Sequence, residues 1–237
     1  MVLYNDSAVV LRTWKLGEAD RIISLYGAQS GKIRAVAKGI RKTKTKFGAR
    51  LEPISYVSVQ CWKGKELDII TQVESIELFP VLKRDLERIR KGFAMVEVVE
   101  ELVGETGADF DIFKLLIRAL YRLEACDSPF LLSGYLWKLL QTQGVVPELD
   151  TCVECGSQEN LSAFARSGNG VVCSKHTNVT QISSDALRVF HLMSEGELSA
   201  ALSLPDSELR LEVEAITVSL VETMLDHKVK ALHLGGY

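Results

Sequence analysis

The stretch Lys32-Ile-Arg-Ala-Val-Ala-Lys38 alternates between charged and apolar side chains along most of its length. Successive side chains of a β-strand point to opposite faces, so this period of two predicts a strand. Its buried face is expected to hold Ile33, Ala35 and Ala37. Its outer face is expected to hold Lys32, Arg34 and Lys38. The stretch therefore predicts a strand that leaves cations on an outer surface.

The flanking residues repeat the strand signal. Short apolar or alternating runs, rich in β-branched and aromatic residues, occupy residues 8–11, 21–26, 54–62 and 67–73. Turn residues separate them at Gly27-Ala-Gln-Ser-Gly31 and Lys63-Gly-Lys65. Five strands in about 75 residues, without a convincing helix between them, favour a small closed barrel. We expect residues 1–80 to form a five-stranded oligonucleotide-binding (OB-fold) barrel.

After Pro80 the apolar period changes from two to between three and four, which is typical of amphipathic helices. Helices are predicted over residues 85–103, 113–123, 130–140, 184–193 and 209–225. Asp109 or Asp111 is a candidate N-cap for the second helix, and Ser128-Pro129 is expected to begin the third. The predicted fold class is multidomain α+β, with a mainly helical domain over residues 81–237 and a metal-binding knuckle inserted at about 147–180.

The knuckle prediction depends on the pattern Cys152-Val-Glu-Cys155 followed, after 17 residues, by Cys173-Ser-Lys-His176. Two pairs of spacing x₂ at this separation are the signature of a tetrahedral zinc site, because one tight turn presents both members of a pair to one ion. Four protein ligands leave no open position, so one structural Zn²⁺ is expected. Cys61 and Cys126 have no partner at ligand spacing and are expected to be core or half-buried thiols.

Residues 32–50 contain eight cations and no acidic residue. Strand alternation places the first ones on an ordered surface, and the remainder is expected to form a mobile loop that contacts a polynucleotide backbone. Phe47, Trp14 or Tyr26 could supply stacking faces, although core positions are an equal alternative for them. The candidate DNA-binding residues are Lys32, Arg34, Lys38, Arg41, Lys42, Lys44, Lys46 and Arg50.

The charge distribution agrees with a localised polyanion site. Residues 1–80 carry 13 Lys and Arg against 8 Asp and Glu, a balance of +5, and residues 81–237 carry 15 against 23, a balance of −8. These sum to the chain's net charge of −3. A basic region on an acidic chain points to one polyanion-binding surface.

Several classes of protein are disfavoured by the sequence. It has no GxxxxGK[ST] phosphate loop, and the zinc ligand that a deaminase requires ahead of its CxxC is missing. No run reaches the ~18 apolar residues of a membrane span, and no secretory signal pattern opens the chain. We expect a non-catalytic, cytoplasmic protein without a membrane association or a small-molecule substrate.

The chain resembles the bacterial RecO family of recombination and repair mediators. The resemblance is carried by Ala8-Val-Val-Leu-Arg-Thr13, Gly17-Glu-Ala-Asp-Arg-Ile-Ile-Ser-Leu-Tyr26, Gly31-Lys-Ile-Arg-Ala-Val-Ala-Lys-Gly39 and Leu51-Glu-Pro53, and by the position of the helices and knuckles after them. One departure is His176, where many members have a fourth cysteine. A Cys₃His set still suits zinc.

The resemblance implies a barrel that binds single- and double-stranded DNA and anneals complementary strands. It also implies two protein partners, RecR and single-strand-binding protein, and a role in loading RecA onto coated DNA in the bacterial cytoplasm, in association with the nucleoid. Family members bind the acidic tail of single-strand-binding protein in the helical domain. The cations on the corresponding helices are Arg118, Arg122 and Lys138.

Two other functions remain open on the sequence alone. In the first, the acidic helical half is a protein-interaction adaptor and the basic segment only assists. In the second, the chain is a metal-dependent nuclease, which would cleave DNA on addition of Mg²⁺ or Mn²⁺, although no clustered carboxylate motif supports it.

Overall fold

The computed structural model describes residues 2–42, 45, 47–104, 107–176 and 179–233. The chain divides into two compact units. We call Met1–Cys126 together with Val229–Tyr237 the barrel unit, and Asp127–Lys228 the helical unit. The sequence predicts separate domains over residues 1–80 and 81–237. That boundary describes which parts of the chain would fold independently, and it stays a prediction.

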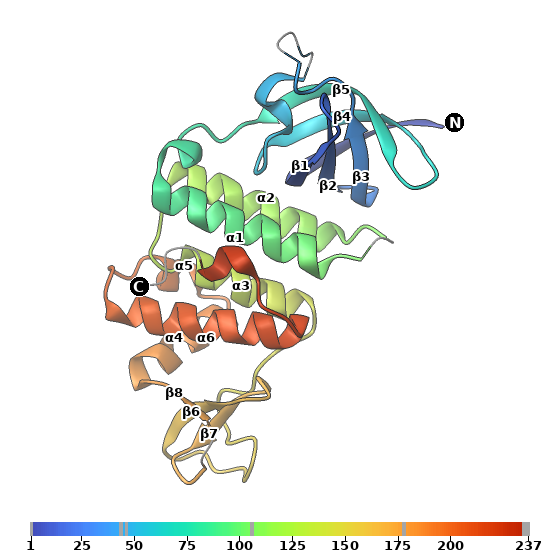
Figure 1. Ribbon diagram of the computed structural model, residues 1–237. Helices are drawn as coiled ribbons and strands as arrows, with labels where there is room; N and C mark the ends of the chain where they lie inside the picture. Colours follow the sequence, from blue (N-terminus) through green and yellow to red (C-terminus); the bar gives the residue numbers. More distant parts are fainter. Residues whose placement is uncertain (1, 43–44, 46, 105–106, 177–178, 234–237) are drawn as a thin grey trace. The chain divides into compact units, whose positions relative to one another are not determined.

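Five strands of the barrel unit close into a barrel in the order β1-β2-β3-β5-β4, as the sequence predicts (Figure 1). They are β1 (Leu3–Leu16), β2 (Asp20–Gly27), β3 (Gly31–Ala37), β4 (Tyr56–Trp62) and β5 (Asp68–Glu77). Neighbouring pairs are antiparallel except β3 and β5, which are parallel. Closure depends on the length of β1, which pairs with β4 along its first half and with β2 along its second.

The predicted inner face of β3 is confirmed. Ile33, Ala35 and Ala37 are buried in the barrel core with apolar residues of the other strands. Each such side chain removed from water contributes about 1 to 3 kcal/mol, depending on its size. The core is therefore contributed by alternate positions of every strand, which leaves the other positions of β3 to the outside.

The first strand is longer than the sequence predicts, because polar residues interrupt its apolar run. Asp6 is 4% exposed, and its carboxylate accepts hydrogen bonds from the backbone N–H groups of Ser7, Gln29 and Ser30. These bonds satisfy the β2–β3 turn and make burial of the charge tolerable. A polar run that resembles a turn in the sequence is thus strand in the fold.

Two helices complete the barrel unit, α1 (Leu86–Leu102) and α2 (Phe110–Ala125). Asp85 and Asp109 cap them, since each carboxylate accepts a hydrogen bond from backbone N–H in the first turn. Asp111, the alternative cap, lies inside α2. Helix α1 packs against β1, α2 and the terminal 3₁₀ turn η3 (Lys230–His233). Two further 3₁₀ turns are η1 (Gly48–Leu51) and η2 (Leu82–Arg84).

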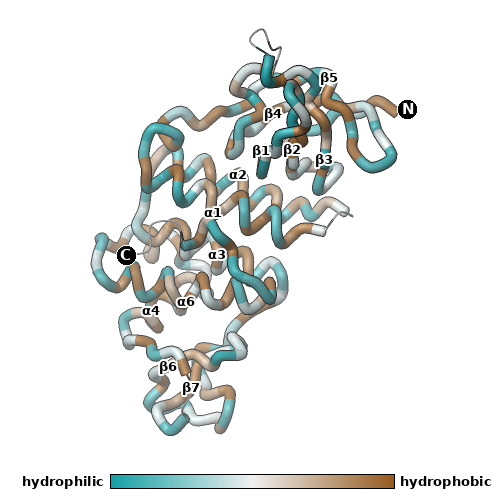
Figure 2. The backbone as a smooth tube through the Cα atoms, viewed as in Figure 1, coloured by the Kyte–Doolittle hydropathy of each residue, from teal (hydrophilic) through white to brown (hydrophobic). Residues whose placement is uncertain are grey.

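The helical unit contains α3 (Leu131–Thr142), α4 (Ser184–Ser194), α5 (Leu198–Leu202) and α6 (Glu208–Leu225). A three-stranded sheet in the order β7-β6-β8 is formed by β6 (Leu161–Ala165), β7 (Val171–Cys173) and β8 (Val179–Gln181). The hydropathy colouring shows apolar residues along α3, whose neighbours within this unit include α6 (Figure 2).

The predicted start of α3 is wrong. The Ser128 hydroxyl donates to the Leu202 carbonyl at 2.6 Å, and the helix begins two residues after Pro129, with Phe130 as its N-cap. The same hydroxyl oxygen accepts from the Phe130 N–H at 3.3 Å, so Ser128 connects the turn before the helix to the end of α5. Within the described residues, no helix is long and apolar enough to cross a membrane.

Candidate metal centre and nucleic-acid interface

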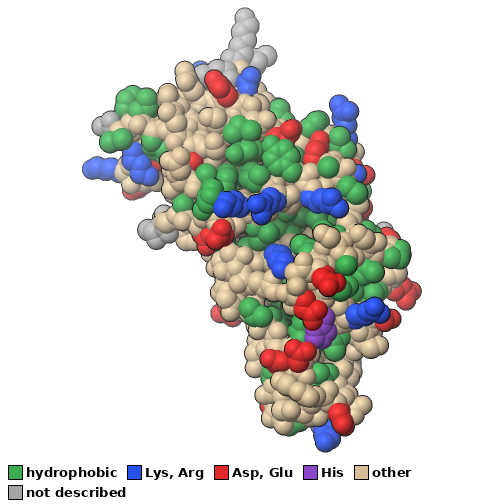
Figure 3. Space-filling view, turned by 180° about the vertical axis from the view of Figure 1, so that it is seen from behind, with side chains coloured by type: hydrophobic (Ala, Val, Ile, Leu, Met, Phe, Trp, Pro, Cys, Tyr) green, Lys and Arg blue, Asp and Glu red, His purple; other side chains and the backbone are tan. Residues whose placement is uncertain are grey.

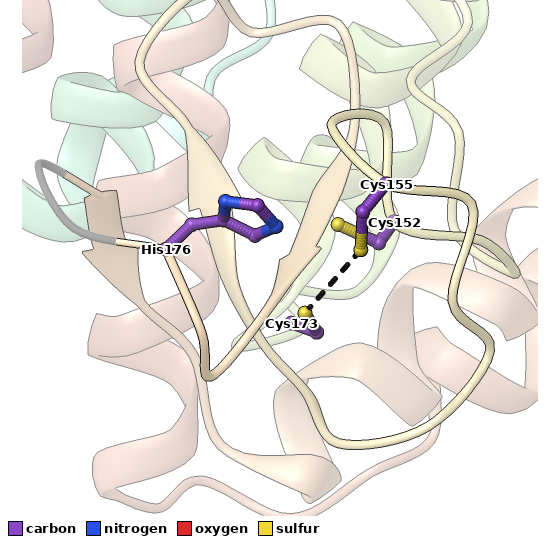
Figure 4. Close-up of side chains that lie close together, drawn as sticks. All are labelled: Cys152, Cys155, Cys173 and His176. Carbon is purple, nitrogen blue, oxygen red and sulfur yellow. Dashed lines mark hydrogen bonds between the residues drawn. The ribbon is translucent and has the colours of Figure 1, made fainter.

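The two cysteine knuckles meet at one end of the small sheet. Cys152 and Cys155 lie in the turn ahead of β6, Cys173 ends β7, and His176 follows it (Figure 4). The four potential ligand atoms all lie within 4.8 Å of one another. The nearest members of the two pairs, Cys155 and Cys173, are 18 residues apart in the sequence. The fold thus brings the two pairs together as the spacing predicts.

Local backbone geometry holds each knuckle. Gly156 adopts a φ of +74°, and its N–H donates to the Cys152 carbonyl at 2.8 Å. A side chain disfavours this left-handed conformation, so glycine suits the position directly after the second ligand. In the other knuckle the His176 N–H donates to the Cys173 carbonyl at 3.2 Å. Each x₂ spacing therefore closes as one tight turn.

The donor atoms fit a tetrahedral metal ion. Cys155 Sγ and Cys173 Sγ are 3.8 Å apart. Two sulfurs bonded to zinc at about 2.3 Å in tetrahedral geometry would be about 3.8 Å apart. In addition, Nε2 of His176 is buried and has no hydrogen-bond partner among the described residues. A buried ring nitrogen without a partner is costly, and a metal ion bound to it would remove that cost.

The protonation state of Cys152 also favours metal binding. Burial raises the pKa of the Cys152 thiol, but hydrogen bonds from the backbone at Cys173, Glu154 and Cys155 outweigh burial and lower it to about 6. The pKa of Cys155 is raised: a backbone hydrogen bond from Ser157 lowers it, and the neighbouring Cys152 and Cys173 thiols and burial raise it more. Cys152 is thus ready to bind as a thiolate, the form that metals require.

The remaining two cysteines differ from each other. Cys61 is fully buried in the barrel, and burial raises its pKa to about 12, so it is an inert core thiol. Cys126 is exposed at the end of α2, which makes the expectation of a core or half-buried thiol wrong for it. The hydrogen-bond acceptors at a helix end need solvent or a cap, which places this position at the surface.

The candidate cations of β3 have different surroundings. Lys32 lies 3.3 Å from Glu100 of α1, and its ammonium donates to the Glu100 carbonyl at 2.7 Å. Its charge is therefore largely neutralised inside the barrel unit. Arg34 and Lys38 are exposed, the first within β3 and the second just after it.

The later cations lie between β3 and β4. Arg41, Lys42 and Arg50 are exposed, and Arg41 donates to the Gly17 carbonyl at 3.1 Å. The contact with Gly17 connects this segment to the β1–β2 turn. The expectations for Lys44 and Lys46 lie outside the described residues.

Of the three candidate stacking residues, Phe47 and Tyr26 are core residues, 1% exposed each. Trp14 of β1 is only partly buried, and the guanidinium groups of Arg12 and Arg34 lie 5.2 and 6.0 Å from its ring centroid. Such cation–π pairs orient both partners on the surface. The sequence analysis missed Arg12, because it lies two strands away from the basic segment and only the strand pairing brings it there.

Together, these features define a class of protein: a closed five-stranded barrel of the oligonucleotide-binding type with exposed cations, joined to a helical unit that contains a Cys₃His metal-type cluster. Comparison with known proteins agrees. Residues 1–79 match the family model for the recombination protein O N-terminal region, and residues 83–233 match that for its C-terminal region. A DNA repair protein RecO from Thermobifida fusca is 35% identical over 240 residues, covering 99% of this chain and 98% of the relative. The chain belongs to the RecO family.

Proposed function

We propose that the protein is a non-catalytic DNA-binding recombination mediator that binds single- and double-stranded DNA and anneals complementary strands. With RecR, it would help load RecA onto DNA coated with single-strand-binding protein. Membership of the RecO family and the name of the relative from Thermobifida fusca support this proposal. Such a role would place it in the bacterial cytoplasm at the nucleoid.

The observation that carries the DNA-binding part is the cationic outer surface of β3 and the residues after it. Arg34, Lys38, Arg41, Lys42 and Arg50 are exposed around one strand and the segment that leaves it. Phosphates bind such a surface without regard to sequence, and release of counterions supplies most of the affinity. Annealing needs this property, because two strands repel each other until their phosphates are screened.

A strand-annealing assay tests the proposal. Complementary fluorescent oligonucleotides, bare or coated with single-strand-binding protein, are mixed with the full chain or with its R34E/K38E variant. The variant should anneal slowly and bind every sequence more weakly. Its log–log salt slope should flatten by about 1.4, because each phosphate that is no longer neutralised removes about 0.7. R188E/K228E, which reverses two exposed cations of the helical unit, is the matched control. Equal annealing by both variants would contradict the assignment.

We also propose that Cys152, Cys155, Cys173 and His176 hold one structural Zn²⁺. Three thiolates and an imidazole are a ligand set that zinc prefers, and four protein ligands leave no position for a reactive water. The ion would cross-link the turn before β6 to the end of β7. Elemental analysis of purified protein should give one zinc per chain, and a chelator should lower the melting temperature.

The adaptor alternative keeps one specific observation in its favour, the charge of the helical unit. That unit has 14 acidic residues against 6 Lys and Arg. The cations considered for the tail of single-strand-binding protein are also divided, with Arg118 and Arg122 on α2 and Lys138 on α3. An adaptor would keep its partner binding and show no DNA affinity that R34E/K38E could reduce.

A further inference from the structure

Helix α2 presents a row of cations that lies outside the basic segment. Lys114, Arg118 and Arg122 are exposed and follow one another at intervals of four residues, so they share one helix face. Lys and Arg side chains gather in a row over α2 in the space-filling view (Figure 3). Two exposed aromatic residues accompany the row, Phe110 (52% exposed) and Tyr121 (41%). We call these five residues the α2 stripe.

The cations of the α2 stripe are not neutralised within the part of the chain that the structure describes. Arg118 and Arg122 form no ion pair there, and the Lys114 ammonium lies 4.3 Å from the Phe110 ring centroid, a contact that keeps its charge. Glu77, the carboxylate whose charge acts on Tyr121, accepts hydrogen bonds from the N–H groups of Leu78 and Phe79. Lys32 differs from these cations, because its charge is neutralised by Glu100.

The geometry of the stripe suits an extended polyanion. A spacing of four residues separates successive cations by about 6 Å along the helix, and the three span about 12 Å. Two nucleotide steps of one strand rise about 7 Å, so alternate phosphates could meet successive cations. An aromatic ring near each end offers a face on which a base can stack. Contacts with phosphates carry no sequence information, so binding along this row would be independent of sequence.

Within the barrel unit, α2 begins at the opposite end of β3 from Lys38 and the cations after it. The start of α2 contacts the β2–β3 turn: the Tyr26 hydroxyl donates to the Asp109 carbonyl at 3.1 Å, and a Cβ on Gly31 would lie 2.2 Å from the Gly107 carbonyl oxygen. The basic segment leaves β3 at its other end, seven residues and about 20 Å away. In Figure 1, α2 lies beneath one end of the barrel.

We propose that the α2 stripe is a second binding surface for the backbone of single-stranded DNA, separate from the cations of β3 and its loop. The inference rests on the proposed function and deepens it. With one strand on each surface, one molecule holds two strands whose phosphates are screened independently. Annealing then requires both surfaces, whereas binding of a single short strand requires one.

The test uses the full chain and its R118E/R122E variant, with R188E/K228E as the control of equal charge change. A fluorescent dT oligonucleotide measures affinity across a salt series, and complementary oligonucleotides measure annealing. We expect R118E/R122E to slow annealing at least tenfold and to reduce the salt slope for long oligonucleotides by about 1.4. R118Q/R122Q, which removes the same two contacts without reversing the charges, should flatten the slope equally but weaken binding less. Circular dichroism melting confirms that each variant is folded.

The outcomes separate this inference from the proposed function. If R34E/K38E impairs annealing and R118E/R122E behaves as the control, the α2 stripe does not bind DNA and the inference fails alone. If neither variant impairs annealing or binding, the proposed function fails as well. A variant R118E/R122E that binds and anneals DNA normally but binds an acidic peptide more weakly would assign the stripe to a protein partner and overturn the inference.

Discussion

The barrel unit and the helical unit carry net charges of opposite sign. The barrel unit has 22 Lys and Arg against 17 Asp and Glu, a balance of +5, and the helical unit has 6 against 14, a balance of −8; these sum to the net charge of −3. A polyanion is attracted to the first and repelled by the second. The proposed nucleic-acid contact and the proposed metal site therefore belong to different units.

The two units also differ in how their polar groups are buried. The barrel unit buries the carboxylates of Asp6, Asp68 and Glu100 and satisfies them internally: Asp68 accepts from the Tyr4 hydroxyl at 2.5 Å and the Gly64 N–H at 2.9 Å. Some of its acidic groups are thus withdrawn from the surface; among its cations Lys91 is buried as well, whereas Arg34 and Lys38 stay exposed. The helical unit instead holds the metal-type cluster, in which Cys152 and Cys173 are buried, His176 is half-buried and Cys155 is exposed. The comparison teaches that the charge of a surface depends on which charged groups are buried as well as on the net charge of the unit.

Removal of a proposed metal ligand is expected to have the largest effect, and it should affect the helical unit alone. Cys173→Ser should abolish metal binding and destabilise the helical unit, because a structural zinc ion can contribute on the order of 10 kcal/mol to a small module. Zinc content and calorimetric melting measure this effect. DNA binding by the barrel unit should persist, and Cys126→Ser should keep the ion. Retention of one zinc ion by the Cys173 variant would refute the ligand set.

A smaller destabilisation is expected inside the barrel unit. Glu100→Ala leaves the Lys32 ammonium without its carboxylate and also removes the acceptor of the Ser24 hydroxyl, which donates to Glu100 at 2.5 Å. Breaking one partner of a buried pair costs about 3 kcal/mol or more, measured by urea unfolding. Glu101→Ala, which removes a looser and more exposed pair with Arg12 at 3.8 Å, should cost less than about 1 kcal/mol. Similar destabilisation of both variants would contradict the buried role of Lys32.

Trp14 tests whether the proposed DNA-binding surface of the barrel unit includes an aromatic stacking site. Trp14→Ala should reduce affinity for single-stranded DNA about tenfold, because stacking of one base on an aromatic ring contributes about 1 to 3 kcal/mol. Duplex DNA, whose bases are already stacked, should be affected less. Trp62→Ala is the control, since Trp62 is a tryptophan of the same barrel and is 37% exposed. Fluorescence anisotropy measures the affinity of each variant for DNA. An equal loss of affinity in both variants would argue against a specific stacking role of Trp14.

The smallest expected effect is the dependence of metal binding on pH. The pKa of Cys152 is lowered to about 6, so its thiolate is favoured above pH 6 and protonation competes with the metal below it. The apparent affinity for the metal should therefore fall as the pH is lowered, and more steeply below about 6, where Cys152 protonates as well. A chromophoric chelator measures the released ion. DNA binding through arginine should not change over this range, because guanidinium stays charged. Metal release that increases with rising pH would contradict the sign.

Much of the fold follows from periodicity in the sequence. The alternation of residues 32–38 and the three- to four-residue period after Pro80 correctly predict a barrel followed by helices. The x₂ spacing likewise predicts the cysteine and histidine cluster, because a tight turn is a local constraint. Errors occur where distant contacts decide, as at Asp6, which a remote turn keeps inside β1, and at Ser128, whose hydroxyl is engaged by Leu202.

By itself the sequence determined which residues could be ligands and which segment is basic, since both depend on neighbours along the chain. Only the tertiary structure decided that Lys32 is paired with Glu100, that Arg12 joins Arg34 at Trp14, and that α2 carries a second row of cations without an ion-pair partner among the described residues. The physical reason is that the strength of a charge at a surface depends on what lies within a few ångströms of it. Those neighbours come from other strands and helices.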